Sequence, residues 1–361
     1  MEKMKAVLLY GIGDIKVETV DKPKPEGGEV LIEVKAVTTC GTDVKTYLRG
    51  YRGDVFPRLF GHGEVAGVVA EVGEKVEKFK VGQRVVAHNS CPCMECEMCL
   101  THNYMACLNQ EKIWSEMGKK YPLGLGGYQE YYLVPEQIVR HNTFEIPNDI
   151  LYEEACQLEP FSCAVHGSAI SGVQLGDTVA IIGSGPQALY HMQVCGLLGA
   201  TTFIMIDRID YRLRMAEKIG ARRPGKVYTI NPEREDMEKR VKELTPFGMG
   251  PDVTIEAAGF PETYEQAIRI VRKLGLANMY AGAKSGTKIT VDTERIHYDG
   301  LTIKGTTHTT PYYVHKAWKL ITTRGVNVKD IVTHKMPLDE APEAFKILTT
   351  TREALKIALI P

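Results

Sequence analysis

The sequence predicts an α/β protein in which a doubly wound parallel-sheet domain is inserted into a β-rich domain. Three observations lead to this fold class. Residues 1–152 read as short strands punctuated by glycine, residues 153–296 alternate apolar strands with helical patterns, and residues 297–361 return to the first style. Alternation of strand and helix is typical of a parallel sheet, whereas runs of strands are typical of a separate β domain. We therefore expect residues 153–296 to be the inserted domain.

The first segment contains several predicted strands. Residues 4–10 and 29–37 read as strands, and Lys22 to Gly28, rich in proline and glycine, reads as the turn region between them. Residues 65–73 and 81–87 are further short apolar segments that contain glycine. This pattern is β-rich and differs from that of the middle third.

A glycine-rich turn between a strand and a helix organises the middle segment. Residues 178–182 form a short, β-branched apolar run, and the residues after it follow the spacing G-x-G-x-x-A. The first glycine allows a tight turn, the second lets a pyrophosphate approach the backbone, and the small third residue lets helix and strand pack closely. A helix over residues 186–198 would then point its N-terminal amides at that phosphate. The predicted cofactor-binding residues of this turn are Gly183, Gly185, Pro186, Gln187 and Ala188.

The next strand supports the same interpretation. Residues 203–206 are apolar and end at Asp207, whose carboxylate can accept hydrogen bonds from a ribose 2′-hydroxyl. An isolated glycine triplet can simply mark a turn that needs positive φ, but here a strand, a helix and an acidic residue accompany it. Asp207 favours NAD because it would repel a 2′-phosphate, while nearby Arg208 and Arg212 keep NADP as the alternative.

Beyond Asp207 the alternation continues. Residues 211–220 form an amphipathic helical pattern that ends at a glycine, and residues 251–259 and 277–282 each read as a strand followed by a turn. From about His297 the alternation stops. Residues 301–306 resume the style of the first domain, so we expect the C-terminal segment to rejoin it.

Composition limits the function classes. The chain has 361 residues and a net charge of −1 without a polybasic run, so nucleic acid and anionic membranes are not expected partners. The first residues lack the apolar core of a signal peptide, and no apolar run is long enough to span a bilayer. We therefore expect a cytoplasmic protein, whose nine cysteines serve as metal ligands or thiols.

Four cysteines are spaced as in a metal-binding lobe. Cys93, Cys96, Cys99 and Cys107 follow the pattern C-x2-C-x2-C-x7-C within residues 91–109. Four thiolates suit tetrahedral zinc, and a site with four protein ligands and no open position is structural. The reducing compartment disfavours disulfides, and a bacterial ferredoxin cluster would need a different last spacing followed by proline. Cys91 is outside the pattern, and His102 reads as a surface residue.

These motifs, in this order, resemble the zinc-dependent medium-chain alcohol dehydrogenases, and most of all their sorbitol (polyol) and threonine dehydrogenase branch. The resemblance covers the whole chain. It is carried by Cys40-Gly-Thr-Asp, Gly61-His62, the four-cysteine lobe, Leu158-Glu-Pro and the turn at Gly183. It implies a Rossmann domain inserted into a GroES-like catalytic domain.

The resemblance also implies a catalytic zinc. Cys40, His62 and Glu159 would be its protein ligands, with Glu159 bound directly or through water, and Thr42 would take the proton of the alcohol. Zinc would bind the substrate oxygen in an open position, and the zinc-bound alkoxide would pass hydride from its carbon to NAD. Outside the family, Cys40 would read as a core thiol, His62 as a loop residue, and Glu159 and Thr42 as helix-capping or turn residues.

Two residues depart from the family pattern. The family has Glu directly after the zinc-binding His, whereas Gly63 precedes Glu64 here, so Glu64 ranks below Glu159 as a ligand. Lys45 stands where these enzymes commonly carry a His that finishes the proton relay. A charged lysine is a poor relay at neutral pH, so the relay would end at ribose hydroxyls or water.

The substrate is the least determined expectation. A secondary alcohol of the polyol class leads, and threonine, a sugar acid or a sugar phosphate is the alternative. Basic residues between Cys40 and His62 would suit an anionic substrate or would simply be solvated: they are Lys45, Arg49, Arg52 and Arg58. A zinc-free quinone reductase and a catalytically silent nucleotide-binding protein are the rival functions. The resemblance further implies a homo-oligomer, with a tetramer expected.

Overall fold

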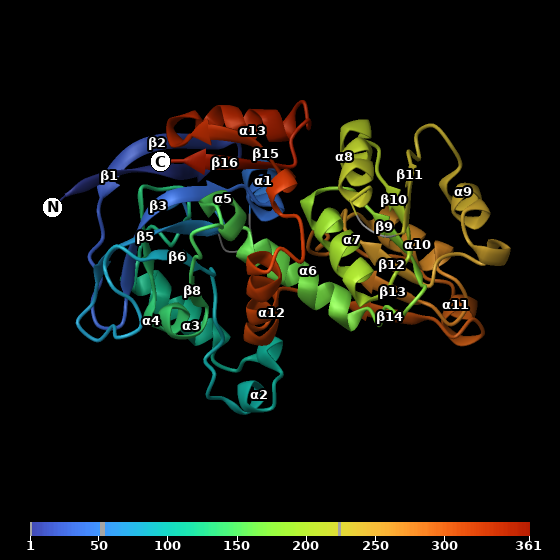
Figure 1. Ribbon diagram of the computed structural model, residues 1–361, viewed down its shortest axis with the longest axis horizontal. Helices are drawn as coiled ribbons and strands as arrows, with labels where there is room; N and C mark the ends of the chain where they lie inside the picture. The colour runs from blue at the N-terminus through green and yellow to red at the C-terminus, as the bar shows by residue number, and fades with distance from the viewer. Residues whose placement is uncertain (1, 51–54, 223–224) are drawn as a thin grey trace. The chain divides into compact units, whose positions relative to one another are not determined.

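The chain folds into two compact units. A computed structural model describes residues 2–50, 55–222 and 225–361. Unit 1 comprises Met1–Pro160 and Thr310–Pro361, and unit 2 comprises Phe161–Thr309 (Figure 1). Unit 2 therefore interrupts unit 1 in the chain, as the fold class predicts. The divisions expected from the sequence were at 152/153 and 296/297.

Unit 1 is built on two sheets. One has the order β2-β1-β4, and the other has the order β15-β16-β3-β5-β6-β8, with β7 also paired to β3. Most of these pairs are antiparallel, and β15 and β16 are parallel. The strands are β1 (Lys3–Gly11), β2 (Asp14–Asp21), β3 (Val30–Thr38), β4 (Arg58–Leu59), β5 (Val65–Val72), β6 (Arg84–Ala87), β7 (Tyr131–Val134), β8 (Thr143–Glu145), β15 (Val332–Pro337) and β16 (Lys356–Ile360).

Short helices connect the strands of unit 1. They are α1 (Gly41–Arg49), α2 (Glu97–Leu100), η1 (Tyr104–Ala106), α3 (Gln110–Lys120), α4 (Glu136–His141), α5 (Tyr152–Ala155), α12 (Pro311–Thr322), η3 (Lys329–Ile331), η4 (Leu338–Glu340) and α13 (Ala341–Thr349). A core of buried side chains that includes Val30, Ile32, Val65, Tyr128 and Phe345 fills the unit. The strands predicted over 4–10 and 29–37 are confirmed as β1 and β3, whereas β2, which carries few buried residues, was not predicted.

Unit 2 is a parallel sheet with connecting helices. Its strand order is β11-β10-β9-β12-β13-β14, and every pair is parallel. The elements are β9 (Thr178–Ile182), α7 (Pro186–Leu198), β10 (Thr202–Ile206), α8 (Asp210–Gly220), β11 (Lys226–Ile230), α9 (Met237–Glu243), η2 (Pro246–Gly248), β12 (Val253–Glu256), α10 (Pro261–Ile270), β13 (Leu276–Met279), α11 (Thr293–His297) and β14 (Thr302–Gly305). The strand order reverses at β9, which places the glycine-rich turn at the switch point of the sheet.

The structure corrects one expectation from the sequence. Residues 301–306 were expected to continue the β-rich domain, but β14 pairs in parallel with β13 and completes the sheet of unit 2. Four residues of β pattern do not specify which sheet they join. A short break separates α5 from α6 (Leu158–Ile170). Pro160 lies in the first turn of α6, where no intrahelical N–H bond is lost.

No helix in the described ranges has the length and apolar character that crossing a bilayer requires.

Candidate functional site

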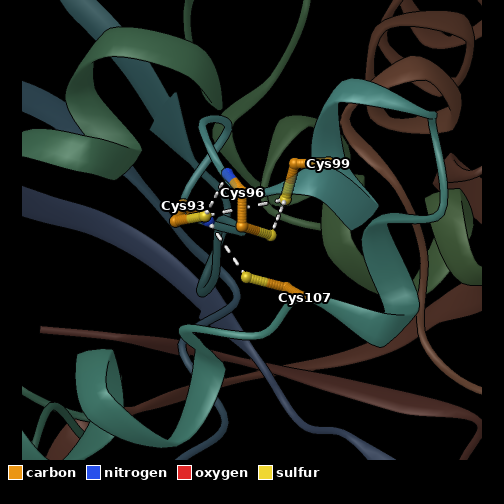
Figure 2. A group of neighbouring side chains, drawn as sticks. All are labelled: Cys93, Cys96, Cys99 and Cys107. Carbon is orange, nitrogen blue, oxygen red and sulfur yellow. Dashed lines mark hydrogen bonds between the residues drawn. The ribbon is translucent and has the colours of Figure 1, made fainter.

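The four cysteines of the lobe converge in unit 1. Their sulfur atoms all lie within 4.8 Å of one another (Figure 2). The Sγ atom of Cys99 is 3.7 Å from that of Cys93 and 3.5 Å from that of Cys96. Four thiolates bound at about 2.3 Å to one tetrahedral ion would lie about 3.8 Å apart. The spacing therefore fits zinc.

The surroundings of these thiols also suit a metal. The backbone N–H of Cys96 donates to Cys93 Sγ, and that of Cys93 donates to Cys107 Sγ. A backbone N–H bond from Cys99 is the main cause that lowers the pKa of Cys96 to about 6, and so favours the thiolate. All nine cysteines are free, so the disulfide alternative has no support in the structure. Cys91 is buried and lies outside the group, and His102 is exposed.

A second group of ligands forms elsewhere in unit 1. Cys40, His62, Glu64 and Glu159 each bring one ligand atom within 4.8 Å of the others. Cys40 caps the N-terminus of α1, His62 lies in a turn after β4, Glu64 directly precedes β5, and Glu159 lies in the first turn of α6. The structure thus brings together the three residues that the resemblance implied, and it adds Glu64 to them.

The capping position holds the Cys40 sulfur in place. Cys40 Sγ accepts from the backbone N–H of Thr42 at 3.5 Å, and the backbone N–H of Cys40 donates to Asp43 Oδ2 at 2.9 Å. Asp43 is itself buried and accepts from the hydroxyl of Tyr128. Because the capping contacts satisfy the free amides of the first turn, the helix start and the thiol are positioned together.

Glycines on both sides place His62. Gly61 and Gly63 have φ values of 104° and 94°, a region that favours glycine. Asn89 Nδ2 donates to the carbonyl of His62 at 2.8 Å and lies 3.3 Å from its Nδ1, while Glu159 Oε2 is 3.6 Å from the same Nδ1. Burial alone would lower the pKa of His62, but the negative charges of Glu159 and Cys40 raise it well above its usual value. The cluster of ligands around His62 therefore attracts positive charge.

Glu64 is fixed by a buried lysine. Lys356 Nζ in β16 lies 2.6 Å from Glu64 Oε2 and donates to the carbonyl of Thr39 at 2.6 Å. The hydroxyl of Thr38 donates to the same carboxylate oxygen, and the other oxygen, Oε1, is buried and has no hydrogen-bond partner among the described residues. Burial raises the pKa of Glu64 to about 7 although Lys356 opposes the shift. A buried carboxylate oxygen without a partner, next to Cys40, His62 and Glu159, fits a cation in this group.

The glycine-rich turn of unit 2 has the geometry expected for a dinucleotide. Gly183 has φ of 94°, and a Cβ there would lie 3.1 Å from the backbone of Ala257. Gly185 caps α7 and Pro186 occupies its first position, as the sequence predicted. Glycine at position 183 permits this close approach of two backbones beside the start of α7, where the amides of a helix N-terminus suit a phosphate group.

Asp207 lies beside this turn. Its Oδ2 accepts from the backbone N–H of Ser184 at 2.7 Å and its Oδ1 from that of Ile209 at 2.9 Å. Arg212 Nη1 is 3.7 Å from Asp207 Oδ2, and Arg208 is exposed. The carboxylate therefore ties the glycine-rich turn to the end of β10, with Arg212 as a partial counter-charge.

The basic residues expected near the substrate are distributed over two elements. Lys45 and Arg49 lie on α1, Arg58 lies on β4, and Arg52 is outside the described residues. Sequence reasoning missed the supporting residues Asp43, Asn89, Tyr128 and Lys356. Only Lys356 carried a usable signal, because a lysine inside the apolar run 354–360 is unusual for a strand.

Comparison with known families gives two matches. Residues 26–147 match the family described as alcohol dehydrogenase GroES-like domain, and residues 188–323 match the family described as zinc-binding dehydrogenase.

Individual proteins resemble the whole chain. Sorbitol dehydrogenase of Bacillus subtilis (strain 168) is 32% identical over 364 residues, which cover 100% of this chain and 98% of that protein. L-threonine 3-dehydrogenase of Pyrococcus horikoshii is 34% identical over 361 residues and 96% of each chain. Among solved structures, a zinc-binding dehydrogenase of Sinorhizobium meliloti 1021 bound to NADP superposes with a TM-score of 0.86 at 29% identity and covers 100% of both chains.

Proposed function

We propose, because this chain belongs to the zinc-dependent medium-chain alcohol dehydrogenases and resembles their sorbitol and threonine dehydrogenases, that Cys40, His62 and Glu159 form its catalytic metal site. As a member of the family, the chain is an oxidoreductase that transfers hydride between a secondary alcohol and a nicotinamide cofactor. The observation that carries the residue assignment is the convergence of these three side chains and Glu64 from four separate segments. Zinc bound there would supply a Lewis acid that makes the substrate hydroxyl acidic.

We assign the proton transfer to Thr42. Its backbone N–H donates to Cys40 Sγ, and its half-buried side chain belongs to the residue two positions after that proposed ligand. A hydroxyl can accept the substrate proton while donating its own, which is what a relay requires. The half-buried Lys45 follows on the same helix, and the relay would end at a ribose hydroxyl or at water.

The cofactor is proposed to bind at the glycine-rich turn of unit 2. Gly183, Gly185, Pro186, Gln187 and Ala188 would hold the pyrophosphate, and Asp207 would accept from the ribose hydroxyls. The negative charge of Asp207 favours NAD, and Arg212 at 3.7 Å leaves NADP as the second cofactor to test.

The proposed substrate is a polyol or a related hydroxy compound. Threonine, sugar acids and sugar phosphates are the alternatives, and the basic residues Lys45, Arg49 and Arg58 would favour the anionic ones. We further propose a cytoplasmic homo-oligomer, with a tetramer as the expected state. Light scattering of the purified protein tests the oligomer.

Initial rates of NAD and NADP reduction test the function. The substrate panel holds sorbitol, xylitol, other polyols, their phosphates, threonine, sugar acids and simple secondary alcohols. We expect strong turnover of one class, with NAD preferred. Absence of turnover on every substrate by a protein that binds NADH and two zinc ions would contradict the proposal and favour a silent nucleotide-binding protein.

A further inference from the structure

The first turn of α7 offers few backbone donors to a phosphate. Pro186 at the first position has no N–H, and the N–H of Leu189 donates to the carbonyl of Gly185 at 3.1 Å. This leaves the backbone N–H groups of Gln187 and Ala188 in the first turn. Ser184, within the preceding turn, already donates its N–H to Asp207. A side-chain donor at this position would therefore add substantially to phosphate binding.

Gln187 can supply that donor. Its side-chain Oε1 accepts from the hydroxyl of Tyr280 at 2.8 Å. An amide has one oxygen and one NH2 group, so engagement of the oxygen fixes the direction in which the NH2 group points. Within the ranges that the structure describes, this NH2 group has no protein acceptor, and the residue is only half-buried. The amide nitrogen is thus an oriented donor, open to solvent, at the start of α7.

The packing of Tyr280 fixes the position of the hydroxyl that donates to Gln187. Its ring meets the ring of the fully buried His191 edge-on, with the centroids 4.3 Å apart. His191 Nδ1 is in turn 2.8 Å from the hydroxyl oxygen of Ser168. Gly167 permits this arrangement, because a Cβ there would lie 2.8 Å from His191 Cε1 and 2.9 Å from Tyr280 Cδ2. The phenol therefore lies in one position before any ligand binds, and ordering it costs no further entropy on binding.

We propose that Tyr280 is a positioning residue that orients the side-chain amide of Gln187 toward the pyrophosphate of the dinucleotide. The proposal rests on the cofactor site described above and adds a second, side-chain donor to its backbone donors. Tyr280 acts through Gln187, so removal of its hydroxyl matters only while Gln187 is present.

Binding of cofactor fragments to the full-length protein tests this role. ADP-ribose carries the pyrophosphate, and adenosine does not. By titration calorimetry we expect Tyr280→Phe to weaken ADP-ribose binding roughly 3- to 10-fold, as loss of one oriented hydrogen bond predicts, and to leave adenosine binding unchanged. Gln187→Leu should weaken ADP-ribose binding by a similar or larger factor. Tyr298→Phe, which alters an exposed phenol of the same unit, is the matched control and should have no effect.

The double variant separates positioning from a general structural effect. In the Gln187→Leu background, Tyr280→Phe should change ADP-ribose affinity less than about twofold. The same loss with and without Gln187, an equal loss with adenosine, or no loss at all would overturn the proposal. If the wild-type protein bound adenosine and ADP-ribose with equal affinity, the pyrophosphate site itself would be wrong, and this inference would fail with it.

Discussion

The four-cysteine group and the Cys40 group are both clusters of metal ligands in unit 1, yet they are built in different ways. The first takes four identical thiols from one short segment between Cys93 and Cys107. The second takes a thiol, an imidazole and two carboxylates from α1, the turn at His62, the start of β5 and α6. Four protein ligands leave a tetrahedral metal no open position, whereas the proposed set of Cys40, His62 and Glu159 would leave one for a substrate.

The residues that support the two groups also come from different distances along the chain. Backbone N–H groups of the lobe itself contact the cysteine sulfurs, so the lobe supports its own ligands. Asp43, Asn89 and Lys356, which come from other parts of the unit, support the second group. We infer that the lobe stabilises the local fold, while the second group depends on the fold of the whole unit.

The largest effect is expected for Cys40→Ala. Loss of the thiolate removes the metal from the second group, so turnover should fall at least about a thousandfold, and bound zinc should fall from about two to about one per chain. Elemental analysis and initial rates measure both. Cys195→Ala, a change at a buried thiol of unit 2, is the control and should retain both zinc ions. Retention of two zinc ions in the Cys40→Ala variant would contradict the assignment of one zinc ion to the Cys40 group.

A change in the lobe should act on stability instead. Cys96→Ala removes one of four ligands, so the lobe zinc is lost and the thermal midpoint should fall by about 5–10 °C. The protein that remains folded should keep the second zinc and turn over within about tenfold of the wild-type rate. Differential scanning calorimetry together with rates on the soluble fraction tests this. Complete loss of turnover in well-folded Cys96→Ala would show that the lobe is part of the catalytic machinery.

Acidification should release zinc from the second group. Protons and zinc compete for the same lone pairs, so a ligand with a raised pKa releases the metal at a higher pH. Burial raises the pKa of Glu64 to about 7, and the charges of Glu159 and Cys40 raise the pKa of His62. In the lobe the pKa values move in both directions, because that of Cys96 is lowered to about 6 while burial raises those of Cys99 and Cys107. We expect the zinc affinity of the second group to fall as the pH drops through about 7. Zinc release monitored with a chromophoric chelator measures the midpoint for each group.

The smallest effect is expected for Asn89→Ala. The side-chain amide of Asn89 holds the carbonyl of His62 and lies near its Nδ1, so its loss loosens a ligand without removing it. Outer-shell changes of this kind should lower turnover about tenfold while both zinc ions remain. Asn103→Ala, at an exposed amide in the lobe, is the control. Equal effects of the two variants on turnover would contradict the proposed role of Asn89.

The sequence predicted features that lie within one segment better than features assembled from distant segments. The lobe and the glycine-rich turn are local, so spacing alone indicated both, and the helix predicted over 186–198 is confirmed as α7. The second group has ligands far apart in the chain, and only the resemblance placed Cys40, His62 and Glu159 together. Gly63 made Glu64 doubtful on sequence, because an inserted residue shifts a side chain unless the backbone compensates. In the structure its φ of 94° and the Lys356 contact bring Glu64 to the group.

Long-range polar contacts were beyond sequence reasoning. The Tyr280 hydroxyl and the Gln187 amide meet across unit 2, and neither residue carries a signal of that pairing. Similarly, β14 was assigned to the wrong domain because sheet membership depends on pairing with β13, not on the residues of Thr302–Gly305 themselves. Contacts between segments far apart in the chain decide which sheet a strand joins and which polar side chains meet.

Zinc anomalous diffraction from crystals of the purified protein, with data collected on both sides of the zinc absorption edge, locates both proposed metal sites. We expect two peaks per chain, one among the four lobe cysteines and one among Cys40, His62 and Glu159. A single peak at the lobe, in protein that actively reduces NAD with an alcohol, would contradict the proposed catalytic site.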